Sequence, residues 1–453
     1  MIGRMAQRFT DGRVPDPGVR VLFAKEYRWQ CWLDVEAALA VAEAQCGVIP
    51  AAAAQAIGSA ARLKGLDLAR IERGIAETSH PLMALVTELA MAAGEHGGWV
   101  HWGATTQNIT QTGDILVLRE AHRKIVRLLA GVLVAAADLA ERTAGMLAAG
   151  RTHGQHAVPI TFGFKPAGWI DELVRHVARL RSAEGRVFTA MTGGAAGTFA
   201  SLGPDGPRVQ DAVAARLGLA SMAVPSRAIA DGFAEYVCLL GLLGATGTRI
   251  AGEVYELMKT ELAEAAEPAP LGTIGSSTMP HKRNPQLSDD CITIGARLRA
   301  LVPLALEGML HDHEVDGAHS AMMEDALQQA CELSGDLLAR LQVIVAGLEV
   351  DQARMRANLA LSGGLISSEA VMLGLGRAIG HQAAHEVVYD AARATDVTFA
   401  SALKRDPRVT AHLDAAAIDR LLDPAGHTGL SASLARAAAQ QARATAHDIT
   451  TAW

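Results

Sequence analysis

Five long segments in the middle of the chain repeat apolar or small residues at helical spacing. They span Asp114–Met146, Phe164–Ala190, Ile229–Glu261, Gln286–Glu314 and Met322–Ala346. In the third segment, the residues that recur at intervals of three, four or seven are Phe233, Val237, Leu240, Gly244, Gly247, Val254 and Met258. Such a stripe is the contact face of a helix that packs against other helices. Segments of about 25 to 33 residues exceed the usual globular helix, and they predict a long bundle that associates most simply with copies of itself.

The composition supports this helical prediction and limits the partners. Half of the residues (50%) are hydrophobic but only 4% are aromatic, so the core must be built mainly from Ala, Leu, Val and Ile, which favours helices over sheets. The net charge of −7, without a basic run, argues against a nucleic-acid partner. The longer uncharged stretches are too rich in Gly, Ala and Thr to favour a membrane partner. Five scattered cysteines indicate free thiols in a reducing compartment, so we expect a cytoplasmic protein: Cys31, Cys46, Cys238, Cys291 and Cys331.

The breaks between the long segments contain most of the polar residues with chemical potential. Residues 275–285 read GSSTMPHKRNP, which places three hydroxyls, two fixed cations and an amide between a glycine and a proline. Such a loop can offer an anionic substrate a lysine, an amide and free backbone N–H groups. Residues 151–156 read RTHGQH and residues 101–108 read HWGATTQN. The glycine-rich residues 192–198 follow a long helix and not a strand, so we expect a turn or close packing there and not a dinucleotide site.

Residues 275–285 resemble the signature of the fumarase/aspartase superfamily, whose members cleave C–N or C–O bonds beta to a carboxylate and usually release fumarate. RTHGQH and HWGATTQN resemble two further segments of that superfamily in the same chain order, so the resemblance covers the whole chain. It implies an all-α fold with a helical domain at 1–113, a central five-helix bundle at 114–350 and a helical domain at 351–453. It also implies a homotetramer with a twenty-helix core, in which three subunits contribute loops to each active site.

The resemblance assigns roles within residues 275–285. Ser276 matches the base that removes a proton alpha to a carboxylate, and cationic and backbone donors nearby would make its alkoxide accessible. Lys282 and Asn284 match the positions that hold the substrate carboxylate, where negative charge develops. Ser277 and Met279 would complete the substrate-binding loop.

The other two segments supply an acid and further substrate contacts. Thr152 and His153 match a Thr-His pair in which the histidine protonates the leaving group or orients the substrate, and an imidazole suits this because it titrates near neutrality. Gln155 matches a substrate-contacting position. Thr105 and Thr106 would donate hydrogen bonds to carboxylate oxygens.

Two positions near the start of the chain leave alternatives open. His80 matches a second active-site histidine of adenylosuccinate lyases, and catalytic and structural roles are equally compatible with the short match. His101 is open in the same way. Asn108 stands where the most similar subgroups usually carry aspartate, which removes a negative charge.

The chain shares features with two branches of the superfamily. Trp102 and the run 347–351 (GLEVD) resemble bacterial 3-carboxy-cis,cis-muconate cycloisomerases, whereas the segment around His153 resembles adenylosuccinate lyases. The cycloisomerases typically carry tryptophan at the position of His153. The phosphate-gripping arginines of adenylosuccinate lyases are missing, because residues 313–324 contain no arginine.

We therefore favour a lyase that releases fumarate from a small dicarboxylate-containing substrate, an N-succinyl amine without a phosphate. The alternatives are a cycloisomerase that forms a lactone, an adenylosuccinate lyase, or a catalytically silent structural homologue. The presence of Ser276, Lys282, Asn284 and His153 together argues against silence.

No cofactor or metal is expected. Serine, histidine and hydrogen-bond donors can carry the reaction without one. His153 and His156 have a spacing that a metal could use, but no carboxylate or cysteine is placed with them. We interpret His311–Glu314 as a polar surface near the site and not as a metal cluster.

Overall fold

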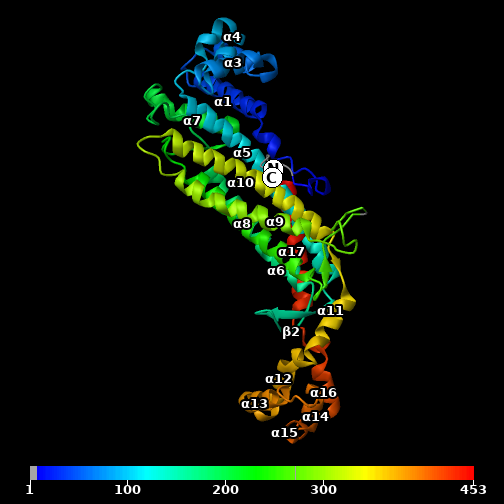
Figure 1. Ribbon diagram of the computed structural model, residues 1–453. Helices are drawn as coiled ribbons and strands as arrows, with labels where there is room; N and C mark the ends of the chain where they lie inside the picture. The colour runs from blue at the N-terminus through cyan, green and yellow to red at the C-terminus, as the bar shows by residue number, and fades with distance from the viewer. Residues whose placement is uncertain (1–7, 271, 453) are drawn as a thin grey trace.

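The computed structural model describes residues 8–270 and 272–452. A long central bundle lies between a group of short helices at one end and a second group at the other (Figure 1). The first group contains α1 (Lys25–Gln45), α2 (Ala51–Ala60), α3 (Leu68–Thr78) and α4 (Met83–Ala92).

The five long segments of the sequence form the five helices of the bundle. They are α5 (Thr106–Arg142), α6 (Phe164–Val187), α8 (Asp231–Leu257), α9 (Gln286–Glu307) and α10 (Gly317–Ala346). Helix α7 (Gly206–Leu217) packs against α1. The all-α fold with a central five-helix bundle, predicted from periodicity and resemblance, is confirmed.

Glycines on α8 explain how closely the bundle helices approach. A Cβ added to Gly244 would lie 2.9 Å from Leu298 on α9, and one added to Gly247 would lie 2.8 Å from Leu337 on α10. No side chain larger than hydrogen fits at either point without displacing a leucine. The small residues of the predicted stripe therefore sit where three helices meet.

Helix α8 is also long and apolar enough to cross a membrane by length and composition alone. However, 56% of its apolar window is buried inside the molecule. Its buried side chains belong to the same hydrophobic core as those of the other bundle helices. This pattern is that of a core helix.

The remaining elements are short. The C-terminal group contains α11 (Gln352–Leu359), α12 (Ser368–Ile379), α13 (His381–Ala392), α14 (Phe399–Arg405), α15 (Pro407–Thr410) and α16 (Ala415–Leu422). Within the described residues the strands form three pairs: β1 (Leu147–Thr152) with β2 (Gln155–Thr161), β3 (Thr189–Ala190) with β4 (Ala220–Ser221), and β5 (Ala265–Ala266) with β6 (Glu349–Val350). Only the first and third pairs are antiparallel.

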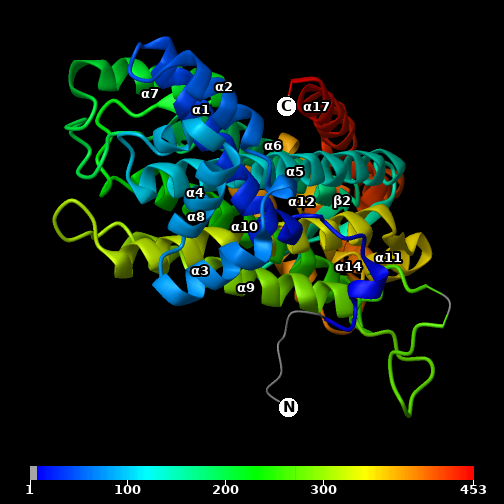
Figure 2. The same cartoon turned by 90° about the horizontal axis from the view of Figure 1, so that it is seen from above.

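Hydrophobic cores cross the predicted domain boundaries at residues 113 and 350. Helix α17 (Ser431–Ala452) lies beside α5, and its Ala439 and Ile449 belong to the bundle core (Figure 2). Val209 and Val213 of α7 belong instead to the core of α1–α4. The three-domain division at those residues stays a prediction.

Candidate functional site

The loop between α8 and α9 holds Ser276 among backbone donors. Ser276 Oγ accepts hydrogen bonds from the backbone N–H groups of Thr278 at 3.2 Å and Met279 at 3.1 Å. The chain crosses itself beside this serine, because a Cβ on Gly275 would lie 1.9 Å from the carbonyl oxygen of Lys282. Asn284 closes the same crossing by donating from Nδ2 to the Gly275 carbonyl at 2.6 Å. The glycine is thus required for the geometry of the loop.

The base of this loop is fixed to the bundle while its tip is exposed. The carboxylate of Glu267 accepts from the backbone N–H groups of Leu287 and Ser288 at 2.9 Å each, at the start of α9. Arg283 forms an ion pair with Glu349 at 2.8 Å. The α8–α9 connection extends away from the bundle (Figure 2), and Met279 is 43% exposed. The loop can therefore reach a neighbouring molecule.

His153 lies at the tip of the β1–β2 hairpin. Thr152 pairs with Gln155, and the two residues between them have positive φ, 52° for His153 and 74° for Gly154. Two central residues of this kind define a type I′ turn. The turn projects the exposed imidazole into solvent, and Thr152 and Gln155 are exposed beside it.

The hairpin is tied to the serine loop at its base. Arg151 binds Glu264 through two contacts of 2.5 and 2.9 Å, and Asn358 Nδ2 donates to the same carboxylate at 2.8 Å. Burial alone would raise the pKa of Glu264, but these partners hold it below its usual value. The hairpin and the α8–α9 connection therefore lie at the same end of the bundle.

Thr105 and Thr106 begin α5 at the opposite end. Asn108 Oδ1 accepts from the backbone N–H groups of Thr105 at 3.0 Å and Gly194 at 3.1 Å. An aspartate would accept the same two bonds, so Asn108 preserves the cap of α5 without the charge.

His80 lies beside this helix start. Its Nδ1 accepts from the backbone N–H of Met83 at 3.1 Å, so the proton of the neutral ring is on Nε2, which lies 3.2 Å from Thr106 Oγ1. As donor to Thr106, His80 leaves that hydroxyl free to donate to a ligand. The geometry assigns His80 a positioning contact with Thr106.

His101 has a structural partner. Its Nδ1 lies 2.6 Å from the buried carboxylate of Glu36. Burial lowers the pKa of His101, but the hydrogen bond and charge of Glu36 outweigh it and raise the pKa above its ordinary value. This ion pair joins the segment before α5 to α1.

A cavity of about 310 Å³ opens at the same end as Thr106. Its polar lining includes Thr106, Gln107, Arg227, His311 and Ser320, which come from the ends of α5, α8, α9 and α10. At the other end of the bundle, Lys282 and Asn284 line a smaller cavity of about 30 Å³.

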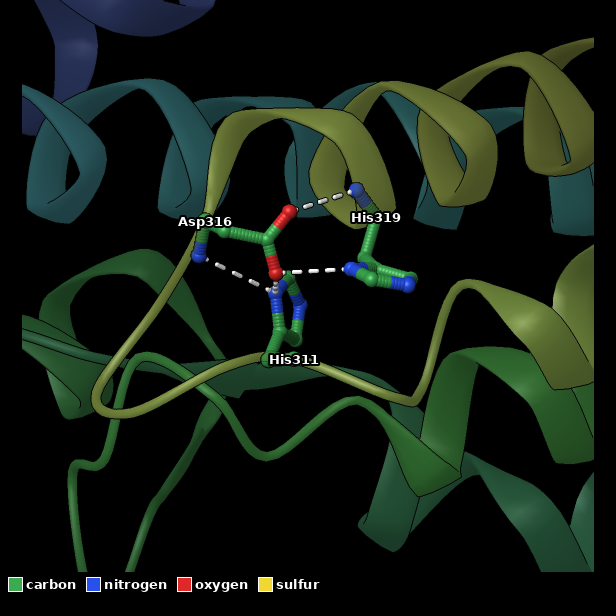
Figure 3. A group of neighbouring side chains, drawn as sticks. All are labelled: His311, Asp316 and His319. Atoms are coloured by element: carbon green, nitrogen blue, oxygen red, sulfur yellow. Dashed lines mark hydrogen bonds and ion pairs between the residues drawn. The ribbon is translucent and has the colours of Figure 1, made fainter.

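His311 belongs to a cluster with Asp316 and His319 (Figure 3). Their potential metal-binding atoms lie within 4.8 Å of one another. Asp316 Oδ2 accepts from Nδ1 of His319 at 2.7 Å and lies 3.3 Å from Nδ1 of His311, while its Oδ1 caps α10. These backbone and side-chain hydrogen bonds hold the pKa of Asp316 below its usual range, and they account for the arrangement. The partner of His311 is thus Asp316.

One chain does not bring the predicted site residues together. Helix α5 has 37 residues and is about 55 Å long at 1.5 Å per residue, and it separates Thr106 from the hairpin of His153. Ser276 lies at the hairpin end. Sequence reasoning missed Arg227, because its contacts to Gln107 and Ala195 join positions far apart in the chain.

Comparisons with known proteins agree with this fold and these segments. A family described as lyase matches residues 12–299, and one described as adenylosuccinate lyase C-terminus matches residues 364–438. The chain is 38% identical over 419 residues to an N-acetyl-S-(2-succino)cysteine lyase of Dickeya dadantii, covering 91% of this chain and 92% of the relative. It is 39% identical over 419 residues to a 3-carboxy-cis,cis-muconate cycloisomerase of Pseudomonas aeruginosa, covering 91% of each.

A solved structure also matches almost the whole chain. The fumarate lyase from Mesorhizobium sp. BNC1 matches with a TM-score of 0.87 and 32% identity, over 94% of this chain and 98% of that one. The fold and the matched segments define a helical lyase. The chain belongs to the fumarase/aspartase superfamily, as the sequence predicted.

Proposed function

We propose that this chain releases fumarate from a substituted succinate by β-elimination, with Ser276 as the base. The observation that carries the proposal is the pair of backbone N–H groups, from Thr278 and Met279, that donate to Ser276 Oγ at 3.2 and 3.1 Å. Donors that are already in place stabilise the alkoxide that a serine base requires. Both donors belong to the loop itself, so they come from the same chain as Ser276.

The reaction proceeds through a charged intermediate. Ser276 removes the proton alpha to one carboxylate, and the electron pair moves onto that carboxylate to give an aci-carboxylate. Lys282 and Asn284 offset the added charge. The electron pair then returns to form the double bond of fumarate, and the bond to the leaving group breaks with its electrons.

The leaving group takes a proton as it departs. His153 supplies that proton, because a protonated imidazole is a competent acid near neutrality. Thr105 and Thr106 hold carboxylate oxygens of the succinyl part, and the hydroxyl of Thr106 is oriented for this by His80. Thr152 and Gln155 border His153 on the hairpin.

The substrate of choice is an S-(2-succino) thioether such as N-acetyl-S-(2-succino)cysteine. The Dickeya dadantii relative, whose name states this substrate, matches almost the whole chain. Adenylosuccinate is disfavoured because residues 313–324 contain no arginine for its phosphate. The relative shifts our preference from the N-succinyl amine predicted from the sequence to a thioether.

A lactone-forming cycloisomerase is the second candidate. Trp102 and the identity to the Pseudomonas aeruginosa relative favour it. His153 favours the lyase, because it can donate a proton to a departing amine or thiolate, and lactone formation releases no such group.

The active form is a homotetramer in the cytoplasm, built around the five-helix bundle. The bundle helices keep large apolar side chains on their surface, with Leu242 of α8 50% exposed and Leu306 of α9 47% exposed. Apolar surface of this kind suits association between copies. Association also joins Thr106 of one subunit to Ser276 of another, which lie at opposite ends of one bundle.

A mass-spectrometric screen tests the proposal. The purified protein is offered N-acetyl-S-(2-succino)cysteine, N-succinyl amino acids, adenylosuccinate and 3-carboxymuconate, with Ser276→Ala as the matched control. We expect fumarate from a phosphate-free substrate with the wild type only. Lactone without fumarate would replace the proposal by the cycloisomerase, and fumarate at the parent rate from Ser276→Ala would remove Ser276 as the base.

A further inference from the structure

Arg227 is a cation of the 310 Å³ cavity without a carboxylate partner among the described residues. Its Nε donates to Gln107 Oε1 at 2.7 Å, and its Nη1 donates to the Ala195 carbonyl at 2.6 Å. A guanidinium has five N–H bonds, so the remaining three, on Nη1 and Nη2, are uncommitted within the described chain. Those are the bonds with which arginine grips a carboxylate in a bidentate manner.

The glycine-rich segment positions this arginine. A Cβ on Gly193 would lie 2.7 Å from Pro225, and one on Gly197 would lie 2.4 Å from the Pro225 carbonyl oxygen. Only glycine permits this approach to the loop that carries Arg227. The segment also supplies the Ala195 carbonyl that holds Nη1, so the close packing expected of this motif also holds one guanidinium in place.

The other guanidinium of the cavity, that of Arg28, is already paired. Arg28 binds Asp114 through two bonds of 2.5 and 2.6 Å and also forms an ion pair with Glu324. The bonds and charges of these two acids raise the pKa of Arg28 although burial lowers it. One guanidinium thus pairs with two carboxylates. This side of the cavity, the Asp114–Arg28–Glu324 wall, cannot bind a further anion. The unpaired positive charge of the cavity belongs to Arg227.

The rest of the lining is apolar or neutral. The apolar side chains are Phe23, Ile115, Leu118, Phe233, Met323 and Leu327. Gln111, Gln328 and Ser320 offer neutral hydrogen-bonding groups. Thr106, which we assign to the succinyl carboxylate, is the residue before Gln107, so the cavity begins at the reaction centre.

We propose that this cavity receives the leaving group, and that Arg227 selects leaving groups that carry a carboxylate. The inference rests on the proposed elimination and specifies the substrate class for it. A monoanionic carboxylate on a short apolar or amide arm matches one unpaired guanidinium whose own partners, Gln107 and the Ala195 carbonyl, are neutral. A phosphate dianion does not, because the Asp114–Arg28–Glu324 wall repels its second charge. Gln107 is the positioning residue for Arg227.

Two substrates that differ by one group test the proposal. They are N-acetyl-S-(2-succino)cysteine and S-(2-succino)-N-acetylcysteamine, which lacks only the cysteine carboxylate. The wild type, Arg227→Gln, Arg227→Lys and the control Arg208→Gln, an exposed arginine on α7, are assayed with both. We expect the wild type to prefer the carboxylate substrate by about 10- to 100-fold in kcat/KM, the range of a charge-assisted hydrogen bond.

The variants separate recognition from folding. Arg227→Gln should lose the preference because its KM for the carboxylate substrate rises, while its KM for the substrate without the carboxylate changes little. Arg208→Gln should keep the full preference, and Arg227→Lys should keep part of it. A merely structural arginine would affect both substrates equally. An unchanged preference in Arg227→Gln, or no preference in the wild type, would overturn the inference and leave the elimination standing.

A binding measurement covers the case in which neither substrate yields fumarate. That result would reject the thioether lyase, and the subsite is then judged by calorimetric titration with N-acetylcysteine and N-acetylcysteamine. We expect the acid to bind the wild type at least about ten-fold more tightly than Arg227→Gln, and the cysteamine to show no such difference. Equal affinities for the acid would reject the subsite as well.

Discussion

At the scale of single residues, the turn at His153 allows the imidazole to be removed without damage to the fold. His153 and Gly154 are the two central residues of a type I′ turn, in which Asn-Gly is the favoured pair. We expect His153→Asn to fold at least as well as the wild type, because asparagine tolerates positive φ better than most residues. The same change should lower kcat by about 10²- to 10⁴-fold, the usual contribution of a general acid.

The measurement is kcat of the wild type and of the variant on the same substrate, beside a thermal melt of each. A variant with full kcat would remove the acid role from His153, whereas a lowered melting temperature would contradict the turn assignment.

His80 offers a second test at this scale, since its two nitrogens have separate contacts. The Nδ1 acceptor supports the start of α4 (Met83–Ala92), and Nε2 holds Thr106. His80→Asn places an acceptor close to the position of Nδ1 but does not reach Thr106. We expect an unchanged melting temperature and a KM raised by about ten-fold, the effect of one lost hydrogen-bond contact. His80→Ala should lower both stability and affinity, and an unchanged KM in both variants would show that the contact with Thr106 is not used.

These residue-level contacts mark the limit of the sequence interpretation. The loops that hold Ser276, His153 and Thr106 were recognisable because each motif is contiguous. His80 and Arg227 were not assignable, since Thr106 is 26 residues from His80 and Gln107 is 120 residues from Arg227. Only the packing of separate elements brings such partners together, and a short motif carries no signal of it.

At the scale of elements, a buried histidine between two bundle helices makes the stability of the fold depend on pH. His176 of α6 is 4% exposed, and its Nε2 lies 2.9 Å from Thr246 Oγ1 of α8. Burial, with a smaller effect of Arg179, lowers the pKa of His176 to about 4. The unfolded chain binds this proton more tightly, with a pKa of about 6.5.

The neutral ring therefore stabilises the fold above pH 6.5, and this contribution is lost as pH falls towards 4. The total is about 3 kcal/mol, at 1.36 kcal/mol per unit of pKa. Urea unfolding at pH 7 and pH 4 checks it against His176→Gln, which keeps a partner for Thr246 but does not titrate. The wild type should lose about 3 kcal/mol more than the variant. Equal losses in the two proteins would contradict the lowered pKa.

The elements themselves were predictable where the apolar period was long. The starts of α6 at Phe164 and α9 at Gln286 match the predicted starts. Helix α5 begins at Thr106 and not at the predicted Asp114. The capping box of Thr105 and Asn108 starts the helix earlier, and its first turns are polar, so they show no apolar period in the sequence. The β1–β2 hairpin was also missed, since the run LAAGRT of β1 lacks the alternation of a half-buried strand.

At the scale of the whole molecule, the length of α5 predicts that catalysis is shared between subunits. Thr106 and Ser276 lie at opposite ends of a bundle about 55 Å long, so no folded monomer can apply both to one substrate. A double variant Thr105→Ala/Thr106→Ala and the variant Ser276→Ala should each be inactive alone. When the two are unfolded, mixed in equal amounts and refolded, some sites combine an intact threonine pair from one chain with an intact serine loop from another.

The size of the recovery follows from random assembly. Each of the two segments is intact in half of the chains, so about a quarter of the sites in mixed tetramers are complete, and we expect about a quarter of the wild-type activity. The matched control is the same treatment of each variant by itself, which should stay inactive, with light scattering to establish four chains per particle. A mixture without activity, from particles shown to contain both variants, would mean that Thr106 and Ser276 serve one chain's site or none. Recovery near the expected fraction would instead show that neighbouring copies supply to each site the half that one chain holds at its far end.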